Sequence, residues 1–521
     1  MKKILALFIT TLQLSCSFSQ IGSLDSDFSA DGRVTHDFGF DEDMLTDMAI
    51  QSDGKIVAVG FTLDGSPGTA ALLRYNPDGS LDNTFNGTGT LLPFSGFSGL
   101  FSVAVDNSGK IVAAGNRDFS NDIWVIRLLS NGNYDSTFSF DGQVVIDLGG
   151  VETTRDMLIQ PDGKIVVCAA SDNRPAFIRL NTDGTLDVSF SNDGKLTLSN
   201  LVNNSFGSIA LQSSGKLVSA FANVDSSEIT TFITRVNVNG TQDNTFATVG
   251  FLNIDLSPTD ISSTLPANLI VDASDRLLIA GRTFTTTNPT AAGFVARLSA
   301  NGSLDNSFNG DGVFIRAISK ANRADAIASQ SDGKYIVGFT IDTLSNANME
   351  VIRLLTDGNT DGSFTDNSSF PPQTVQVDFA SRNELLTSLL LQPNGRIVVG
   401  GRARLTSDVT SVQFAIARLL NDVDLTINND ISENLFRLYP NPTAGPLTIE
   451  LNENKSRIVA VVLTNSLGEI VLLTAENQFS ETDQNKSTLL LPSNITGGLY
   501  NVTIQLENGT TFNQRLIVYN D

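Results

Sequence analysis

The sequence predicts an all-β protein: a seven-bladed β-propeller closed by its own N-terminal strand, followed by a small Ig-like β-sandwich. Two repeated signals predict the propeller. The hairpin RYNPDGSLDNTF (Arg74–Phe85) returns five more times, with Asp eight and Phe eleven residues after the Arg. An apolar strand, a polar turn ending in Gly-Lys and a second apolar strand also recur, as in MAIQSDGKIVAVG from Met48. A different signature after residue 436 predicts the second domain.

Length and composition favour a repeat array built from short strands. A chain of 521 residues is too long for one ordinary core. It is 41% hydrophobic and 17% charged, and its 42 glycines suit many tight turns. The net charge of −23 argues against nucleic acid and anionic membrane surfaces as partners, because both need a basic face. We expect an acidic, exported monomer without a transmembrane segment.

The first residues read as a targeting signal. Lys2 and Lys3 precede the apolar run Ile4–Leu14, which is too short to span a bilayer. Small residues three and one before the cut predict cleavage after Ser19, with Gln20 as the alternative site. The prediction is a signal peptide over residues 1–19.

Cysteine usage excludes an intrachain disulfide in the mature chain. Cys16 raises a lipoprotein alternative, but Gln13 makes a poor lipobox. Cys168 then remains alone in the apolar strand KIVVCAA, where a buried, inert thiol is expected. Packing alone must hold the protein together.

Each repeat reads as four antiparallel strands. Strand-like alternation runs through every copy, and Asp-Gly or Asn-Gly between apolar runs indicates hairpins. We expect the third strand to end at the Arg and the fourth to begin at the LDNTF-type segment. A period near 55 with four short strands is the size of a propeller blade. The basic residues of the Gly-Lys turns lie 52 to 62 residues apart: Lys55, Lys110, Lys164, Lys216, Arg276, Lys334 and Arg396.

The order of the parts predicts how the ring closes. The first LDxxF-type segment, Ser23–Val34, has no third strand before it. The last third strand, Phe414–Asn421, has no LDxxF segment after it, and Thr426 stands eight residues beyond Arg418. The mature N-terminus is therefore expected to supply the fourth strand of the seventh blade, with Asp25 as the partner of Arg418.

The spacing of Arg and Asp predicts a structural ion pair in every copy. A turn between them places the two side chains nearly opposite on adjacent strands, where we expect a cross-strand pair that links blades. The alternative, an arginine ring that captures an anion, is disfavoured because each Arg has a neutralising partner. The predicted pairs are Arg74 with Asp82, Arg127 with Asp135, Arg179 with Asp187, Arg235 with Asp243, Arg297 with Asp305, Arg353 with Asp361, and Arg418 with Asp25.

This region resembles the delta-60 repeat family of bacterial propellers. The hairpins Gln160–Val167 and Arg179–Phe190 carry the resemblance, which covers residues 21–421. It implies a β-propeller and no particular activity. The fourth and fifth copies depart most, for example at Gln242, and we expect an irregular loop over Leu256–Pro266.

The chain end carries a second signature after a polar linker, residues 422–435. Alternating strands separated by Gly and Pro turns predict a small all-β domain over residues 436–521. It resembles the type A C-terminal sorting domain of the type IX secretion system of Bacteroidota. That resemblance implies Sec export, passage across the outer membrane, and release or surface attachment. An Ig-like module without a sorting role is the alternative. The motif residues are Tyr439, Pro440, Asn441, Pro442, Gly498 and Tyr500.

Catalytic and metal-binding patterns are sparse. His36 is the single histidine and falls on the predicted closing strand, so a His-dependent nucleophile has little support. No His/Cys cluster has metal-ligand spacing. The one tryptophan, Trp124, is expected to pack between blades, with a sugar-stacking platform as the alternative.

Two runs of alternating oxygen-bearing side chains raise the alternative of a calcium-binding loop. Phe308 interrupts one run, no bidentate Glu follows, and Asx-turn chemistry explains the acids. We therefore expect no cofactor, with calcium as the alternative. The runs are Asp305, Ser307, Asn309 and Asp311 before Gly312, and Asp25, Asp27, Ser29 and Asp31 before Gly32.

The functional prediction is a non-enzymatic, secreted or surface-attached propeller that binds a glycan, peptide or protein by its loop faces. One alternative is a polysaccharide-degrading enzyme, a glycosidase or lyase, that uses carboxylates in the propeller funnel. A structural part of an adhesin is a third. Residues that break the repeat discriminate between them, because a catalytic pair or a ligand site should not recur in every blade.

Overall fold

The computed structural model describes most of the repeat region and most of the C-terminal strands. The predicted signal peptide, the predicted linker and Pro440–Pro442 lie outside the described residues. The described residues are 21–63, 68–93, 98–117, 122–199, 201, 204–224, 229–254, 256, 261–285, 291–342, 347–365, 373–379, 383–404, 412–421, 436–439, 443, 446–451, 458–464, 470–475, 480–483, 486–489, 491, 495, 498–506 and 511–518.

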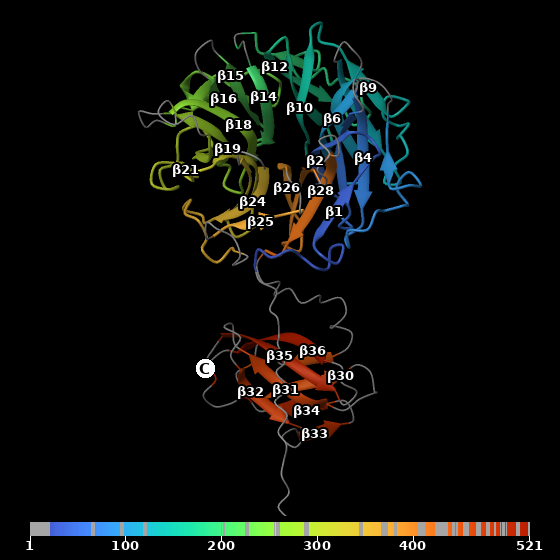
Figure 1. Cartoon of the computed structure of the whole chain (residues 1–521), viewed down its shortest axis with the longest axis vertical. Coiled ribbons are helices and arrows are strands. Elements are labelled where there is room, and N and C mark those ends of the chain that lie inside the picture. The colour runs from blue at the N-terminus through green and yellow to red at the C-terminus, as the bar shows by residue number, and fades with distance from the viewer. Residues whose placement is uncertain are drawn as a thin grey trace, which may run out of the picture. The chain divides into compact units, whose positions relative to one another are not determined.

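The chain divides into two compact units, Met1–Val423 and Asp424–Asp521. The first unit is all-β and propeller-like, with sheets arranged around a common centre (Figure 1). Apart from a single 3-10 turn, η1 (Phe246–Thr248), its described secondary structure consists of strands.

Five sheets of the first unit have four strands each, joined in chain order. They are β6 (Ser98–Val105), β7 (Ile111–Arg117), β8 (Asp122–Leu128) and β9 (Gln143–Ile146); β10 (Glu152–Ile159), β11 (Ile165–Ser171), β12 (Arg174–Leu180) and β13 (Lys195–Thr197); β14 (Asn204–Leu211), β15 (Leu217–Val224), β16 (Ile229–Val236) and β17 (Phe251–Ile254); β18 (Ile261–Val271), β19 (Leu277–Thr285), β20 (Ala292–Leu298) and β21 (Val313–Ile315); and β22 (Ala321–Ser329), β23 (Tyr335–Asp342), β24 (Ala347–Leu354) and β25 (Val375–Val377).

The other strands form one eight-stranded sheet. A single parallel pair, Glu42 with Val412, joins its two groups of four strands. One group is β2 (Glu42–Ile50), β3 (Ile56–Leu63), β4 (Thr69–Tyr75) and β5 (Thr90–Leu91); the other is β26 (Glu384–Leu391), β27 (Ile397–Arg404), β28 (Val412–Leu419) and β1 (Arg33–His36).

The first strands of successive groups lie side by side in the order β2, β6, β10, β14, β18, β22 and β26, and β26 lies beside β2. Hydrophobic side chains fill the space between neighbouring sheets. For example, Val57 and Leu72 pack in one cluster with Leu100 and Ile111. Neither face of a sheet is hydrophobic and uncovered, which is the packing that a repeat of this length requires.

A β-bulge recurs in the first strand of every group and changes the direction of side chains near the centre of the unit. In β2 the register shifts between Leu45 and Asp47, and in β10 it shifts between Thr154 and Asp156. The extra residue re-aims the side chain that follows it. Asp47 and Asp156 are thereby brought toward the neighbouring first strands, where they accept hydrogen bonds.

The fourth strands begin later than the sequence predicts. Leu81 forms one isolated bridge with Tyr75, and the chain then turns before β5 starts at Thr90. Asp82 causes the turn, because its carboxylate accepts the backbone N–H of Thr84 at 3.0 Å. The LDNTF-type segment is therefore a turn that sends Phe85 into the core.

The prediction of an irregular loop over Leu256–Pro266 is wrong in part. Residues 257–260 lie outside the described ones, but Ile261–Pro266 belong to β18, a strand of 11 residues. Two register shifts, between Ile261 and Ser263 and between Pro266 and Asn268, accommodate the irregular sequence. Pro266 is tolerated because a bulge interrupts the ladder there.

The N-terminal strand β1 pairs antiparallel with β28, from Arg33 opposite Ala417 to His36 opposite Phe414. Earlier in the chain, the Asp25 N–H donates to the Arg418 carbonyl at 2.9 Å. Phe28 is 0% exposed and packs with residues of β2, β3 and β28. The two ends of the repeat region are thus hydrogen-bonded and packed together.

The second unit contains two four-stranded sheets that share one hydrophobic core. Leu447 and Ile449 of the first sheet pack with Val461, Val502 and Leu516 of the second. The strands are β29 (Phe436–Tyr439), β30 (Leu447–Leu451), β34 (Lys486–Leu489) and β33 (Ser480–Asp483) in one sheet, and β32 (Ile470–Ala475), β31 (Ile458–Thr464), β35 (Gly498–Leu506) and β36 (Thr511–Val518) in the other.

The packing of the N-terminal segment can be tested with Phe28→Ala. The variant leaves a cavity between β3 and β28 and should lower the free energy of unfolding by about 3–5 kcal/mol. Phe190→Ala is the matched control, since Phe190 is the equivalent, fully buried residue of an internal repeat. Urea unfolding measures both, and a loss below about 1 kcal/mol for Phe28→Ala alone would contradict the packing described.

Candidate functional site

The structure brings every predicted Arg–Asp pair into contact. In each pair the arginine Nε donates to the aspartate Oδ2 at 2.7–2.9 Å: Arg74–Asp82, Arg127–Asp135, Arg179–Asp187, Arg235–Asp243, Arg297–Asp305, Arg353–Asp361 and Arg418–Asp25. All but the last lie within one hairpin, because the tight turn returns the chain beside the arginine.

The link to the neighbouring sheet differs from the expected ion pair between blades. It is made by arginine Nη1, which reaches the turn that follows the third strand of the next repeat. Arg179 donates to the Val238 carbonyl at 2.6 Å and Arg235 to that of Ala300 at 2.8 Å. The other five contacts are Arg74 to the Ser130 carbonyl, Arg127 to that of Thr182, Arg297 to that of Thr356, Arg353 to the Asn421 side chain, and Arg418 to the Pro77 carbonyl.

A phenylalanine completes each of these units, which we call arginine clamps. In every repeat the guanidinium lies 4.7–5.2 Å from the centre of the Phe ring eleven residues later, or from that of Phe28 in the case of Arg418. The turn glycine of the next repeat packs on the same ring. A Cβ on Gly132 would stand 3.0 Å from the Phe85 ring, and its φ of +88° disfavours other residues as well.

The lysines of the Gly-Lys turns join the same clamps, a role that the sequence analysis missed. Lys164 Nζ lies 2.9 Å from Asp187 Oδ2, and Lys216 Nζ lies 2.7 Å from Asp243 Oδ2. Arg396 does the same for Asp25 at 3.1 Å. The constant basic residue after the turn was the signal that could have revealed it.

The clamps hold their aspartates ionised. Burial would raise the pKa of Asp82, but hydrogen bonds from Thr84 and Lys55 outweigh it and keep that pKa well below its ordinary value. The same balance lowers the pKa of Asp187. With their charges neutralised and their donors engaged, the seven arginines leave little for an outside anion to bind.

The residues of the two calcium-type runs use their oxygens within the chain. Asp305 Oδ1 accepts from the Ser307 hydroxyl at 2.6 Å, while its Oδ2 accepts from Arg297. Asp311 Oδ1 accepts the Val313 N–H at 2.9 Å. Asp25 faces Arg418 and is 2% exposed. These are Asx-turn and ion-pair contacts, so the runs present no converging, open set of ligands.

The other residues singled out in the sequence are buried or packed. The Trp124 indole is fully buried and donates to Gln143 at 3.1 Å, so it offers no surface for a sugar. Cys168 is fully buried, and burial raises the pKa of its thiol to about 12. His36 lies on β1 with its ring 4.6 Å from that of Phe38, and burial lowers its pKa.

Two carboxylates meet at the innermost strands. Ser102 Oγ lies 3.2 Å from Asp47 Oδ2 and 3.1 Å from Asp156 Oδ1. Backbone N–H groups of the next first strands also bind them: Val103 donates to Asp47 and Ile209 to Asp156, each at 2.9 Å. The pair therefore ties four first strands, β2, β6, β10 and β14, together around the centre.

Protonation is shared within this pair. Burial raises the pKa of Asp47 to about 7, and the charge of Asp156 adds to the effect. Ser102 has one hydroxyl proton and cannot donate to both acids, so the second contact is satisfied when one carboxyl is protonated. Both acids occupy the same repeat position, next to the bulge.

Arginines that break the repeat gather on three neighbouring sheets. They are Arg282 on β19, Arg323 on β22, and Arg402 and Arg404 on β27. Burial, with the charge of Arg323, lowers the pKa of Arg282, and burial likewise lowers that of Arg402, with Arg323 and Arg404 adding to it. Arg323 is thus near both Arg282 and Arg402, and Arg404 is near Arg402; we call these four side chains the arginine cluster.

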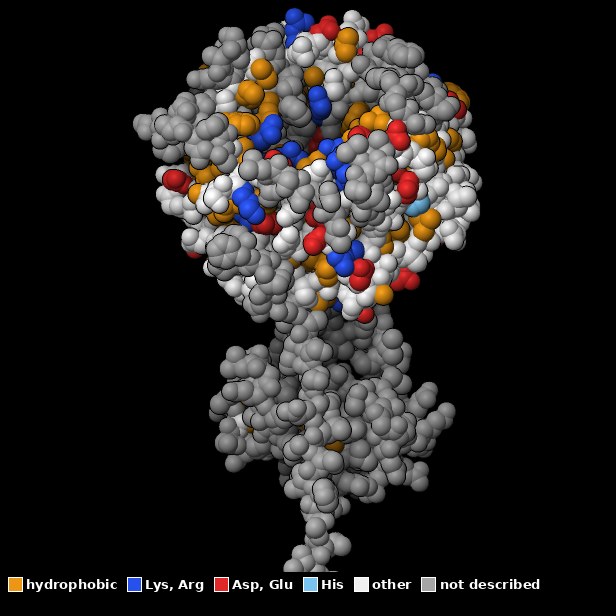
Figure 2. Space-filling model, viewed as in Figure 1, with side chains coloured by type: hydrophobic (Ala, Val, Ile, Leu, Met, Phe, Trp, Pro, Cys, Tyr) orange, Lys and Arg blue, Asp and Glu red, His pale blue; other side chains and the backbone are white. Residues whose placement is uncertain are grey.

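Three acids lie near the arginine cluster: Asp325 and Asp342 near Arg282, and Glu42 near Arg402. Asp325 Oδ1 accepts from Arg323 Nε at 2.7 Å, and burial raises the pKa of Asp325 to about 6. Arg323 keeps 28% of its side chain exposed, and Arg402 and Arg404 are also partly exposed. Figure 2 shows Lys and Arg side chains gathered around the hollow of the face it draws.

Aromatic rings stand at related positions on neighbouring strands. Phe61 is the repeat counterpart of Arg282 and Arg402, the residue after the central glycine position of the second strand, and its strand β3 belongs to the same eight-stranded sheet as β27. Its ring lies 6.1 Å from that of Phe101 on β6, and both side chains are partly exposed. Equivalent positions of different repeats thus carry basic or aromatic side chains, an asymmetry that the repeated sequence pattern does not predict.

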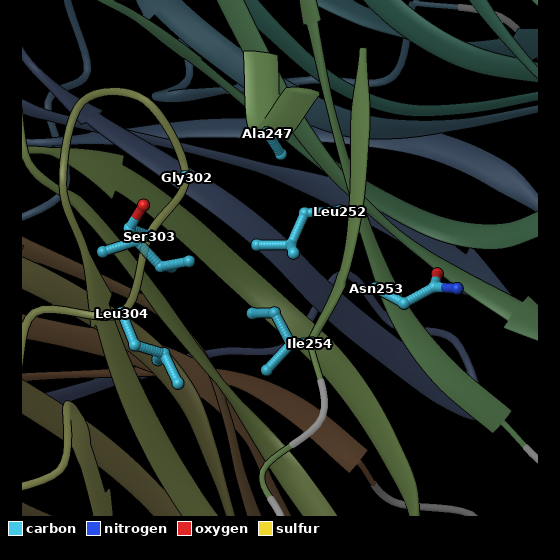
Figure 3. A pocket seen from close by; sticks show the side chains of 8 residues that line it. Ala247, Leu252, Asn253, Ile254, Gly302, Ser303 and Leu304 are labelled. Carbon is cyan, nitrogen blue, oxygen red and sulfur yellow. The ribbon is translucent and has the colours of Figure 1, made fainter. Parts of the chain in front are cut away.

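A separate pocket of about 400 Å³ lies between β17 and the turn after β20 (Figure 3). Leu252, Ile254 and Leu304 give it an apolar lining, with Ser303 and Asn253 as its polar groups. It contains no titratable side chain among its lining residues and offers no acid–base chemistry.

The sorting-motif residues fall on the second unit. Tyr439 ends β29 with 38% of its surface exposed, Gly498 begins β35, and Tyr500 is buried on that strand. Pro440, Asn441 and Pro442 lie outside the described residues. In the described part of the chain, no helix has the length and apolar character of a membrane span.

Family comparisons match both parts of the chain. Residues 437–519 match a model described as a secretion system C-terminal sorting domain. A β-propeller domain of unknown function, DUF5122, matches residues 51–85, 107–138, 160–190, 273–308, 330–364 and 392–422. The copy around Arg235, where Gln242 departs from the pattern, is absent from the matched segments.

Solved propeller structures are similar at low identity. An inactive virginiamycin B lyase from Staphylococcus aureus, with quinupristin, is 11% identical, with a TM-score of 0.42 over 74% of this chain and 98% of that one. A gluconolactonase from Xanthomonas campestris is 12% identical, with a TM-score of 0.33 over 75% and 92%. The propeller domain of the trilobed protease from Pyrococcus furiosus is 11% identical, with a TM-score of 0.38 over 71% and 92%. No curated protein matches the sequence.

The protein has aspartates with lowered pKa values and aspartates with raised pKa values, and together they predict that its stability is greatest near pH 4. Six aspartates of the arginine clamps have lowered pKa values, so their stabilisation is lost as the pH falls below about 4, the unfolded value: Asp82, Asp135, Asp187, Asp243, Asp305 and Asp361. Asp43 and Asp47, with pKa values raised to about 7, bind protons in the folded state that the unfolded state has lost, so stability falls as the pH rises from about 4 to 7.

Urea midpoints measured across this pH range test the prediction. Asp47→Asn removes one raised acid and should flatten the decline toward neutral pH. A urea midpoint that rises steadily from about pH 4 to pH 7 would contradict the prediction, because it would show that ionisation of Asp43 and Asp47 does not lower the free energy of unfolding.

Proposed function

The chain carries repeats of the DUF5122 β-propeller family and a secretion system C-terminal sorting domain, and from this premise we propose that it is a non-enzymatic, exported propeller that binds an acidic glycan at the arginine cluster. The observation that carries the proposal is the set of four arginines that break the repeat at the centre of a protein with a net charge of −23.

The sorting domain directs export by type IX secretion, to the cell surface or beyond it. We therefore expect the ligand of the propeller to be extracellular.

The proposed frame of the site is a seven-bladed ring closed by the N-terminal strand. The contacts of arginine Nη1 support it, since they run from each repeat to the next and the last, from Arg418, returns to Pro77 in the first. The pairing of β1 with β28 supports the closure. For the second unit we propose an Ig-like sandwich, supported by two four-stranded sheets around one core.

The arginine cluster suits an anion better than the arginine clamps do. Within the described residues, one acid, Asp325, forms an ion pair with a member of the cluster. Arg282 and Arg404 each have a buried Nε without a hydrogen-bond partner. Planar guanidinium groups bind carboxylate and sulfate oxygens through paired N–H donors, and they do so more strongly where water is partly excluded.

Shape and charge favour a narrow polymer over a folded partner. The cluster spans β19, β22 and β27, which belong to three neighbouring sheets, so several anionic groups in a row would be needed to engage it. An acidic folded protein would meet the repulsion of the strongly acidic body. The rings of Phe61 on β3 and Phe101 on β6 supply apolar contact for a sugar face.

A polysaccharide-degrading enzyme is the second candidate, because Asp47 and Asp156 are close and Asp47 has a pKa near neutrality. Their oxygens, however, are occupied by Ser102, Ser208 and Ser388 and by backbone N–H groups. A catalytic acid and base need oxygens that can reach the substrate. The arrangement favours a role in holding the first strands together.

Binding of a polyuronate oligosaccharide to the mature chain tests the proposal. Replacing two cluster arginines, Arg282→Gln with Arg402→Gln, should weaken binding at least about tenfold and reduce its salt dependence. The single variants Arg282→Gln and Arg402→Gln are each compared with Arg174→Gln, which also removes one arginine charge, from an exposed site at the start of β12.

Three outcomes of this assay contradict the proposal. Equal binding by the cluster variant and the control would move the site elsewhere. Preference for a neutral oligosaccharide or for polyglutamate would exclude an acidic glycan. Release of shortened or unsaturated sugar, abolished by Asp47→Asn, would establish the enzyme instead.

A further inference from the structure

A buried carboxylate oxygen without a partner lies at the crossing from one sheet to the next. Glu152, the first residue of β10, is 1% exposed. Its Oε1 accepts from the Ser171 hydroxyl at 3.0 Å and from the Gly150 N–H at 3.2 Å. Its Oε2 is buried and has no hydrogen-bond partner. An unsatisfied buried carboxylate oxygen is costly, so this one needs an explanation.

Two further carboxylates converge on Glu152. Oxygens of Asp122, Asp147 and Glu152 all lie within 4.8 Å of one another. The register places Asp122 opposite Asp147, because Ile123 pairs with Ile146 at the adjoining position of β8 and β9. Like charges directly opposite on paired strands destabilise a sheet unless something neutralises them.

Neighbouring cations do not provide that neutralisation. Lys195 Nζ donates to the backbone carbonyl of Asp147 at 3.0 Å, and the Arg117 guanidinium lies over the Trp124 ring. Within the described parts of the chain, no Lys or Arg forms an ion pair with any of the three carboxylates. Burial raises the pKa of Glu152, and the charges of Asp147 and Asp122 raise it further.

Rigid elements hold the three acids in place. Asn116 at the end of β7 donates to the carbonyls of Asp122 and Glu152, at 3.2 and 3.3 Å, and accepts the Thr154 N–H at 2.8 Å. The Gly149 N–H binds Asp147 Oδ1 at 2.6 Å. The site is thus fixed by the starts of β8 and β10 and the end of β9, rather than by a long loop.

We propose that Asp122, Asp147 and Glu152 bind a Ca²⁺ ion that joins the β6–β9 sheet to the β10–β13 sheet. An oxygen-only set suits a hard divalent cation, and oxygens on opposite sides of Ca²⁺ stand about 4.6–5.2 Å apart. Three oxygens within 4.8 Å of one another fit inside that sphere. Asp147 is exposed, so water completes the coordination, and Ca²⁺ accepts such an irregular set more readily than Mg²⁺ does.

The closing sheet contains a natural comparison. Asp37 and Asp43 occupy the repeat positions of Asp147 and Glu152, and the Gly39 N–H binds Asp37 Oδ1 at 2.7 Å. The third position is Gln413, whose amide donates to Asp37 Oδ2 at 3.3 Å. A neutral donor there replaces the third carboxylate, so we propose the ion for the Glu152 position alone.

Calcium titration of the mature chain tests the site, with isothermal titration calorimetry for binding and thermal unfolding in chelator against excess Ca²⁺ for stabilisation. The wild type should bind one Ca²⁺ with a dissociation constant of about 10⁻⁴–10⁻³ M, as extracellular sites do, and should unfold at a higher temperature with the ion. Asp147→Asn should weaken binding at least about tenfold and remove the rise. Because Asp147 is exposed, this substitution should leave the fold intact.

Asp37→Asn is the matched control, because it makes the same change at the equivalent exposed position. It should keep the full calcium response. Glu152→Gln should abolish that response, and its unfolding temperature in chelator shows that the variant folds. The proposal fails if the wild type shows no saturable calcium binding, or if Asp147→Asn and Asp37→Asn respond alike.

Discussion

The arginine clamp is the interaction on which the rest of the first unit depends. One guanidinium touches its own aspartate, its own phenylalanine ring and a backbone carbonyl of the next repeat, as Arg179 does with Asp187, Phe190 and Val238. A buried charge is stable only when its donors are satisfied, and here a single side chain satisfies them while fixing the distance between two sheets. The fixed distance then sets where the first strands and their bulges lie around the centre.

The regularity of the clamps explains why the sequence revealed so much of the fold. Arg, Asp, Phe and the turn glycine all recur at constant spacing because each contacts another, so the four strands of a repeat and the pairing of Arg418 with Asp25 could be predicted from spacing alone. The late start of the fourth strands could not, because Asp82 and Thr84 build a turn where alternation suggests a strand. The role of Lys164 could have been inferred from the basic residue that recurs after each of these turns, although a lysine at such a place is also common on surfaces.

The candidate sites were harder to predict for the opposite reason. Arg282 and Arg402 share one repeat position, Arg323 occupies another, and the arrangement of the first strands around a common centre brings the three together. Asp122, Asp147 and Glu152 likewise come from the ends of three strands. The two sites that we propose therefore lie where the repeat is broken, while the repeated charges of the clamps are engaged with one another.

The repeated contacts hold neighbouring sheets together, and the one cysteine within the described residues, Cys168, is a free thiol. The central claim, that the N-terminal strand completes the last blade, is tested most directly by cross-linking. Thr35 and Ala415 are register partners in β1 and β28, so Thr35→Cys with Ala415→Cys should form one intramolecular disulfide under mild oxidation, while buried Cys168 stays reduced. Peptide mapping by mass spectrometry should find that single link; free thiols at both positions, or links between chains, would contradict the closure.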